Sequence, residues 1–293
     1  MGLNDYLTPS VVAEELGLLA RRAVKKSSDG QVSFLVVEGP TDSDLWGPLC
    51  ARGEEQVFAA GTRGLVEQLL EHLGRDPIDA CNCAFLTDCD GLGKQQRLRE
   101  ANHLIVTECC DLEADLISIG AADRVLEDAV GSAEVARRMR ERAVSVGVAV
   151  SRVRRAAARE RVSMKKRGRR LTLLDMGWST VCSAVDEGES STLDLVSEAL
   201  NWSETDVAYV KGTLSGIPEE FELVCNGKDV FDGLSAQLDE AGNNQFNGVS
   251  GLVKAVQRSV QLEDLIRWEV GRRLLAWQKG CAGNLLLSTG VPA

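Results

Sequence analysis

Short apolar runs alternate with amphipathic stretches over residues 1–110. Runs rich in apolar and β-branched residues occupy 32–37, 56–59, 83–87 and 103–106. Apolar residues recur at helical spacing over 9–26, 42–50 and 65–73. Strands that are apolar throughout and alternate with helices are typical of a parallel sheet covered on both faces. The pattern therefore predicts an α/β fold with a Rossmann-like parallel sheet.

The pattern turns helical after residue 111. One long basic helix is expected over 136–170, interrupted near Gly147. A turn-rich stretch follows at 239–251, and an amphipathic helix at 262–278. We therefore predict four regions: an N-terminal helix (1–30), the α/β domain (31–130), a basic helical segment (131–180) inserted after it, and a mainly helical C-terminal region (181–293).

Charge is distributed unevenly along this chain, whose formal net charge is −11. Residues 133–170 carry 14 basic and 3 acidic side chains, whereas both flanking segments are acidic. Ion pairing within a helix does not neutralise such an excess. The segment is either a solvated helix or a surface for nucleic-acid phosphates or an acidic partner, and we favour the surface. The candidate phosphate contacts are Arg137, Arg138, Arg152, Arg154, Arg155, Lys165, Lys166 and Arg167.

Composition narrows the class of protein. The apolar runs are far shorter than the roughly 18 residues of a membrane span, and the first residues lack a signal-peptide pattern, so a cytoplasmic protein is expected. Nine cysteines without C-x-x-C spacing predict buried thiols in a reducing compartment. The chain has no P-loop and no G-x-S-x-G motif, which argues against ATP binding by a P-loop and against a serine hydrolase of that type.

Acidic residues directly follow two of the predicted strands. Glu38 follows the first strand and Asp42 comes four residues later, while Asp88 and Asp90 follow the third strand. The carboxyl ends of parallel strands share one edge of the sheet, where ligands of open α/β folds bind. Grouped carboxylates repel each other unless a cation lies among them, and all-oxygen ligands suit Mg²⁺. The sequence predicts a divalent-cation site, although Asp42 or Asp44 would also serve as a helix cap.

These acidic motifs carry a resemblance to a known family. VVEGPTD, which contains Glu38, and TDCDG, which begins at residue 87, together resemble the toprim domain. This domain is the Mg²⁺-binding α/β unit of topoisomerases, primases and OLD-type nucleases. The resemblance covers residues 31–119 and 223–234.

Three further segments resemble the OLD-like branch of the toprim superfamily. They are AAGTRGLVEQLLEHL, VTECCDLEADL and LVCNGKDVFDGL, and the last two nominate Glu113 and Lys228. Pro40 and Arg63 depart from the pattern, because such proteins often have lysine at these places. A lysine exposed in a turn is the other interpretation of Lys228.

The resemblance implies a nuclease that cleaves phosphodiester bonds with Mg²⁺ or Mn²⁺. Glu38 would be the general base or a metal ligand, and Lys228 would offset charge on the phosphate in the transition state. The implied metal-binding set is Glu38, Asp42, Asp88, Asp90 and Glu113.

Stand-alone toprim proteins of this kind resemble the effector subunits of bacterial anti-phage systems such as PARIS. That likeness implies a tRNA or DNA target and an ABC-type ATPase partner. Two alternatives stay open: a non-catalytic toprim subunit that binds or regulates within a complex, and an enzyme acting on another phosphorylated substrate. A homodimer also stays open, because aromatic and basic residues around Trp268 would suit an oligomer face or core as well as base stacking.

Overall fold

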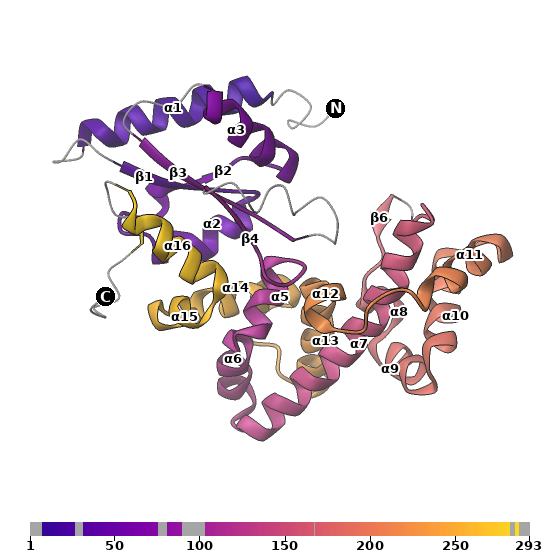
Figure 1. Ribbon diagram of the computed structural model, residues 1–293. Coiled ribbons are helices and arrows are strands. Elements are labelled where there is room, and N and C mark those ends of the chain that lie inside the picture. Colours follow the sequence, from indigo (N-terminus) through magenta and orange to yellow (C-terminus); the bar gives the residue numbers. More distant parts are fainter. Residues whose placement is uncertain are drawn as a thin grey trace. The chain divides into compact units, whose positions relative to one another are not determined.

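The computed structural model describes residues 8–26, 32–75, 81–89, 103–166, 168–281 and 285–286. The chain divides into two compact units (Figure 1). The first unit combines Met1–Glu108 with Val260–Ala293, and the second is Cys109–Ser259. The sequence-based boundary at residue 130 therefore falls inside the second unit.

The first unit contains a four-stranded parallel sheet (Figure 1). Its strands are β1 (Val32–Val37), β2 (Val57–Ala59), β3 (Cys81–Thr87) and β4 (Leu104–Val106). They lie in the order β2-β1-β3-β4, and Val36 aligns with Phe58 on one side and Phe85 on the other. All six residues of β1 are buried, which requires apolar side chains on both faces of the strand. The prediction of an α/β fold with a parallel sheet is confirmed.

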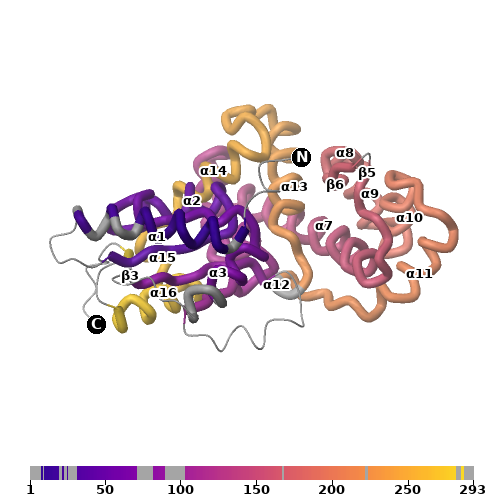
Figure 2. The backbone as a smooth tube through the Cα atoms, turned by 90° about the horizontal axis from the view of Figure 1, so that it is seen from above, coloured from indigo at the N-terminus to yellow at the C-terminus, as the bar shows by residue number. Residues whose placement is uncertain are grey.

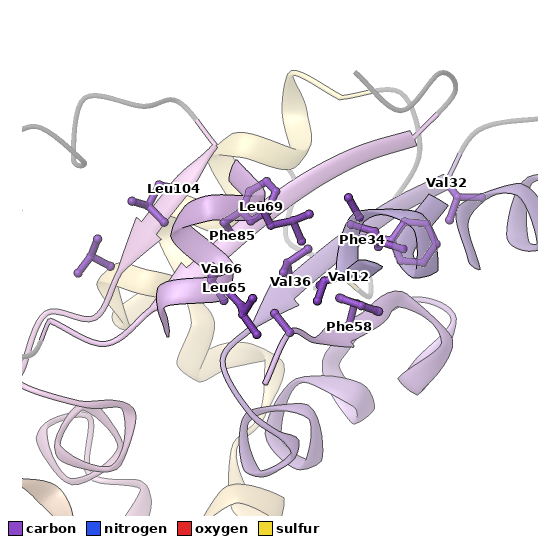
Figure 3. Close-up of a cluster of buried hydrophobic side chains, with 14 residues drawn as sticks. Val12, Val32, Phe34, Val36, Phe58, Leu65, Val66, Leu69, Phe85 and Leu104 are labelled. Atoms are coloured by element: carbon purple, nitrogen blue, oxygen red, sulfur yellow. The ribbon is translucent and has the colours of Figure 1, made fainter. Parts of the chain in front are cut away.

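Two helices cover one face of this sheet. They are α1 (Pro9–Lys26) and α3 (Arg63–Arg75). Figure 3 shows Val12 of α1 and Val66 of α3 in the same cluster of buried side chains as Phe34 of β1. All three side chains are essentially inaccessible to solvent. Burying apolar area at about 25 cal/mol per Å² makes this cluster a main source of the unit's stability.

The other face of the sheet is covered by elements from both ends of the first unit (Figure 1). They are α2 (Pro40–Trp46), the 3₁₀ turns η2 (Gly47–Leu49) and η3 (Gly53–Gln56), α15 (Leu262–Arg267) and α16 (Glu269–Lys279). Trp46 stacks on Trp268 with ring centroids 5.0 Å apart, and both indoles are buried. Trp268 has an extended backbone, so the single helix expected over 262–278 is two helices. Its place in the core confirms one of the two interpretations of this tryptophan.

The second unit is mostly helical and is organised around the 27-residue α7 (Ala133–Arg159) (Figure 2). The other helices are α5 (Leu112–Ser118), α6 (Ala121–Val130), α8 (Leu173–Met176), α9 (Trp178–Glu187), α10 (Glu189–Leu200), α11 (Glu204–Leu214), α12 (Phe221–Val224), α13 (Gly227–Glu240) and α14 (Val249–Ser259). Val153 and Ala157 near the end of α7 pack with Leu193 of α10 and Val210 of α11. A short antiparallel hairpin, β5 (Lys165–Lys166) and β6 (Arg169–Arg170), follows α7.

The expected interruption of the basic helix at Gly147 is wrong, and so is its extension to residue 170. α7 runs through Gly147 and ends at Arg159. A Cβ atom at Gly147 would lie 2.9 Å from Cγ2 of Val230 and 3.2 Å from Sγ of Cys225. The glycine therefore allows close packing against α13 instead of breaking the helix.

We expect Gly147→Val to lower the free energy of unfolding by about 1–3 kcal/mol, because the added side chain would overpack the contact with Val230. Ser145→Val is the matched control, since Ser145 is exposed on the same helix and receives the same β-branched side chain. Urea unfolding followed by circular dichroism measures both. Equal losses in the two variants would contradict the packing explanation.

Candidate functional site

The strand order places a topological switch point between β1 and β3. The chain leaves β1 for β2 on one side and later enters β3 on the other side. In open α/β sheets, ligands bind outside the carboxyl ends of the strands at such a point. Glu38 directly follows β1 and Asp88 directly follows β3, so both lie at this edge.

A hydrogen bond joins the two strand ends. The backbone N–H of Asp88 donates to Oε1 of Glu38 at 3.0 Å, and both residues are half-buried. Backbone bonds fix the same edge, since the N–H of Gly61 donates to the carbonyl of Glu38 at 2.8 Å. The N–H of Cys89 donates to Oγ1 of Thr107 at 2.8 Å. The carboxylate of Glu38 is thus held at the end of β3, beside the backbone of Asp88.

Asp42 has a structural partner on its own helix. Its Oδ2 accepts a hydrogen bond from the backbone N–H of Gly39 at 2.8 Å, at the start of α2. Pro40 occupies the first turn of that helix, where no donor is needed. The capping role that the sequence left open for Asp42 is therefore present. Asp90 lies outside the described residues.

Glu38 and Asp88 are the acidic residues directly after β1 and β3. Among the residues that the structure describes, no group of three or more histidine, cysteine, aspartate or glutamate side chains is placed to hold a metal ion. Mg²⁺, however, is usually bound by one or two carboxylates, with water and substrate phosphate completing its octahedron. Glu38 and Asp88, which follow adjoining strands, are the candidate ligands for such a site.

A second group of acidic residues lies in the second unit, where α5 and α13 begin. Oδ1 of Asp111 accepts hydrogen bonds from the N–H of Ala114 at 2.8 Å and of Gly227 at 3.0 Å. Burial, reinforced by the charge of Glu113, raises the pKa of Asp111 to about 7. Gly227 is required there, since a Cβ atom would lie 2.2 Å from the nitrogen of Ala114. One buried carboxyl group thus caps two helices.

Lys228 and Glu113 lie next to this double cap. Nζ of Lys228 is 3.9 Å from Oε1 of Glu113. The side chain of Glu113 is 10% exposed and that of Lys228 is 59% exposed. Asn226 begins α13 and accepts a hydrogen bond from the N–H of Lys228 at 3.1 Å. Glu113 and Lys228, which the sequence nominates from distant segments, are therefore neighbours within one unit.

Sequence reasoning missed a buried charge cluster in the second unit. Asp229 is 2% exposed, with Oδ1 2.7 Å from Nη1 of Arg154 and Oδ2 3.2 Å from Nη2 of Arg170. Ser151 donates to the same carboxylate at 3.2 Å. Asp232, one turn further along α13, accepts from the N–H of Leu173. The only available sequence signal was the i, i+3 spacing of two aspartates in an apolar helix.

The contacts of the basic segment correct the expectation for three of its arginines. Arg154 is 10% exposed and pairs with Asp229. Arg152 is 14% exposed and pairs with Glu189. Arg155 donates to the carbonyl of Val224 and to Sγ of Cys110. Because these guanidinium groups bind protein, we remove Arg152, Arg154 and Arg155 from the phosphate-binding set.

The remaining candidates of the basic segment are exposed. Arg137 and Arg138 each form an i, i+4 ion pair, with Glu141 and Glu134 respectively. Such exposed pairs contribute little to stability, about 0.3–0.5 kcal/mol each. Lys165 and Lys166 are exposed in the hairpin, and Arg167 lies outside the described residues.

Comparisons with known proteins add no assignment: no family model matches the chain, and no curated protein or solved structure is significantly similar to it. Every helix in the part of the chain that the structure describes is either too short or too polar for a bilayer crossing.

We expect Gly227→Ala to lower the free energy of unfolding by about 1–3 kcal/mol, because a methyl group would collide with the backbone at Ala114. Gly212→Ala is the control, since Gly212 lies exposed in α11 and a methyl group there would meet only open space. Alanine there should raise stability by about 0.5–1 kcal/mol through helix propensity. Urea denaturation measures both changes, and a stabilising Gly227→Ala would contradict the close approach.

We expect the Asp232→Asn variant to gain stability relative to the wild type as pH rises. Burial, together with the charge of Asp229, raises the pKa of Asp232 to about 6. An acid whose pKa is raised on folding favours the folded state below its unfolded value near 3.8 and loses that contribution as pH rises through 6. Asparagine keeps the acceptor for Leu173 without the charge.

The stability difference between the Asn variant and the wild type should therefore grow between pH 4 and pH 7, by at most about 3 kcal/mol for a shift of about two units. Denaturant unfolding at a series of pH values measures this difference. A difference that stays constant across the range would mean that Asp232 does not carry the predicted cost of ionisation.

Proposed function

We propose that this chain is a metal-dependent nuclease of the toprim superfamily, in its OLD-like branch. One observation carries the proposal: the Asp88 amide holds the carboxylate of Glu38 at the β1/β3 switch point. Two acidic strand ends at that edge support a site for Mg²⁺ or Mn²⁺ and a phosphate. The bound ion would supply positive charge for the scissile phosphate and activate water for attack.

The residues of the first unit have distinct proposed roles. Glu38, oriented by the backbone amide of Asp88, is general base or ligand, since a base must be held within reach of the proton that it takes. Asp88 is a metal ligand. Asp42 and Asp90 stay in the proposal on the strength of the resemblance. The capping bond of Asp42 does not remove it, because a carboxylate accepts several hydrogen bonds.

The proposed roles of Lys228 and Glu113, which lie in the second unit, rest on the resemblance. A lysine that is anchored at its backbone and exposed at its tip can contact a phosphate. In this proposal Lys228 offsets negative charge that builds on the phosphate. Glu113 is retained as a proposed metal ligand from the same resemblance.

The proposed substrate is nucleic acid, either tRNA or DNA. The exposed cations Lys165, Lys166, Arg137 and Arg138 supply sites for phosphate contacts in an otherwise acidic chain. The proposed role in anti-phage defence and the control by an ABC-type ATPase partner rest on the resemblance alone. The lack of a P-loop in the sequence is consistent with ATP being handled by another chain.

A non-catalytic toprim subunit is the second candidate. It is favoured by the finding that, within the described ranges, no three ligands gather for a metal and Asp42 has a capping partner. Such a subunit would bind nucleic acid or partner protein without cleaving it.

We expect Glu38→Gln to reduce Mg²⁺- or Mn²⁺-dependent cleavage of labelled tRNA or DNA by about 100-fold or more, the usual range for losing a general base. Asp88→Asn should also reduce cleavage, because the proposed metal ligand loses its charge. Glu14→Gln removes one negative charge from an exposed position of α1 and should leave the rate unchanged. Gel assays on the chain, alone and with proteins that co-purify from its native host, measure the rates. Intact binding without cleavage by the wild type under every metal condition would favour the non-catalytic subunit.

A further inference from the structure

The hairpin of the second unit has a basic residue at every paired position. Lys165 pairs with Arg170 across the two strands, and Lys166 pairs with Arg169. All four are exposed, and the side chain of Arg169 is 75% exposed. Gly168 allows the tight turn between the strands, with φ +83°.

This arrangement works against the hairpin's own stability. Like charges placed directly opposite each other on neighbouring strands are destabilising, and a two-stranded hairpin is only marginally stable by itself. Both cross-strand pairs here combine two cations. Where sequence breaks a local rule of stability, a functional site is the usual reason. The negative charge that would neutralise the two lysines is expected from a ligand.

Strand β6 of the hairpin is nevertheless anchored by ion pairs. Arg170 binds the buried Asp229, and Arg169 binds Asp175 at 2.7 Å. Nη2 of Arg154 donates to the carbonyl of Leu171, directly after β6, at 2.6 Å. These contacts hold the hairpin in place without relying on its own ladder.

The two lysines are left for a ligand. In the part of the second unit that the structure describes, no carboxylate pairs with Lys165 or Lys166. The arginines at the other two paired positions have acidic partners. In this hairpin, β6 is therefore anchored and partly neutralised by aspartates, whereas β5 is exposed and cationic.

We propose that the β5–β6 hairpin is the docking element for the phosphodiester backbone of nucleic acid, with Lys165 and Lys166 as its phosphate contacts. The choice of ligand follows from charge density. Adjacent strands lie about 4.8 Å apart, so each cross-strand pair places two cations side by side on one face of the hairpin, Lys165 with Arg170 and Lys166 with Arg169. Duplex DNA carries one negative charge per about 1.7 Å of axis, whereas side chains on one face of a peptide strand recur only every ~7 Å.

The inference deepens the proposed function, on which it rests for the need to hold nucleic acid. Because Arg170 binds Asp229, the hairpin is tied to the first turn of α13, which also carries Lys228. Nucleic acid docked on the hairpin is then held on the same unit as Lys228. The long helix α7 acts as support, since its inward arginines bind protein.

The test is binding of labelled tRNA and labelled duplex DNA in EDTA, where metal-dependent cleavage is absent, followed by fluorescence anisotropy at several salt concentrations. We expect Lys165→Gln/Lys166→Gln to weaken binding about tenfold and to reduce the log–log salt slope by about 1.8 for duplex, as two lost phosphate contacts predict. Lys211→Gln/Arg258→Gln is the control, since both residues are exposed in the last turns of α11 and α14. It should bind within twofold of the wild type.

Three results would overturn the inference. One is wild-type affinity in the hairpin variant while circular dichroism shows a folded protein. Another is an equal loss in the control variant, which would indicate a diffuse charge effect. The third is displacement of nucleic acid by polyglutamate at equal charge concentration, which would favour an acidic protein as the partner.

Cleavage assays separate this inference from the proposed function. Glu38→Gln should bind nucleic acid as the wild type does and yet fail to cleave it. Hairpin-dependent binding without any cleavage by the wild type would reject the nuclease and keep the docking element. Cleavage by the wild type, together with binding that is unchanged in the Lys165→Gln/Lys166→Gln variant, would reject the docking element and keep the nuclease.

Discussion

The first unit depends on the burial of β1 at the centre of its sheet. This strand pairs with β2 on one side and β3 on the other, and all of its side chains are buried. A central parallel strand must end at the same edge as its neighbours, so whatever follows it enters the ligand-binding edge. For this chain that residue is Glu38, and the amide of Asp88 fixes its carboxylate. The proposed chemistry is thus a consequence of which strand occupies the centre.

In the second unit, the corresponding constraint is a buried cluster of charged side chains. Asp229 is almost fully buried between two arginines that come from α7 and from the hairpin. Removing one partner from a buried ion pair leaves an uncompensated charge, a loss of about 3–5 kcal/mol in general. The cluster therefore ties three segments of the chain to one carboxylate. It also explains why a helix so rich in arginine is not a uniform cationic surface.

The strands and first helices were predictable because their signals are local. β1 and α1 have the bounds that apolar periodicity indicates, since every residue of a buried strand and every third or fourth residue of a helix must be apolar. The bounds of the basic helix were not predictable in this way. In the sequence alone, Gly147 indicates a helix break. Its packing against Val230 in the fold shows why a glycine is needed there.

In the candidate site, too, the features with local sequence signals were predictable and those that depend on distant contacts were not. The adjacency of Glu38 and Asp88 follows from strand direction, which the sequence pattern indicates. The partners of Arg154 and Arg152 do not, because Asp229 and Glu189 lie on other helices far along the chain. Periodicity shows that a residue is polar, and the fold decides which distant residue it meets. A charge run therefore marks candidates without separating phosphate contacts from ion pairs of the core.

The stacked tryptophans have a consequence for biosynthesis. Trp46 is made early and Trp268 late, yet they belong to one hydrophobic layer of the first unit. The second unit is continuous in sequence, so it can fold on the ribosome as soon as residue 259 has emerged. All four strands of the sheet are translated before the second unit, whereas α15 and α16, which carry Trp268 and contribute to the layer on one face, are translated after it. That face of the sheet is therefore fully covered only after the second unit has been synthesised.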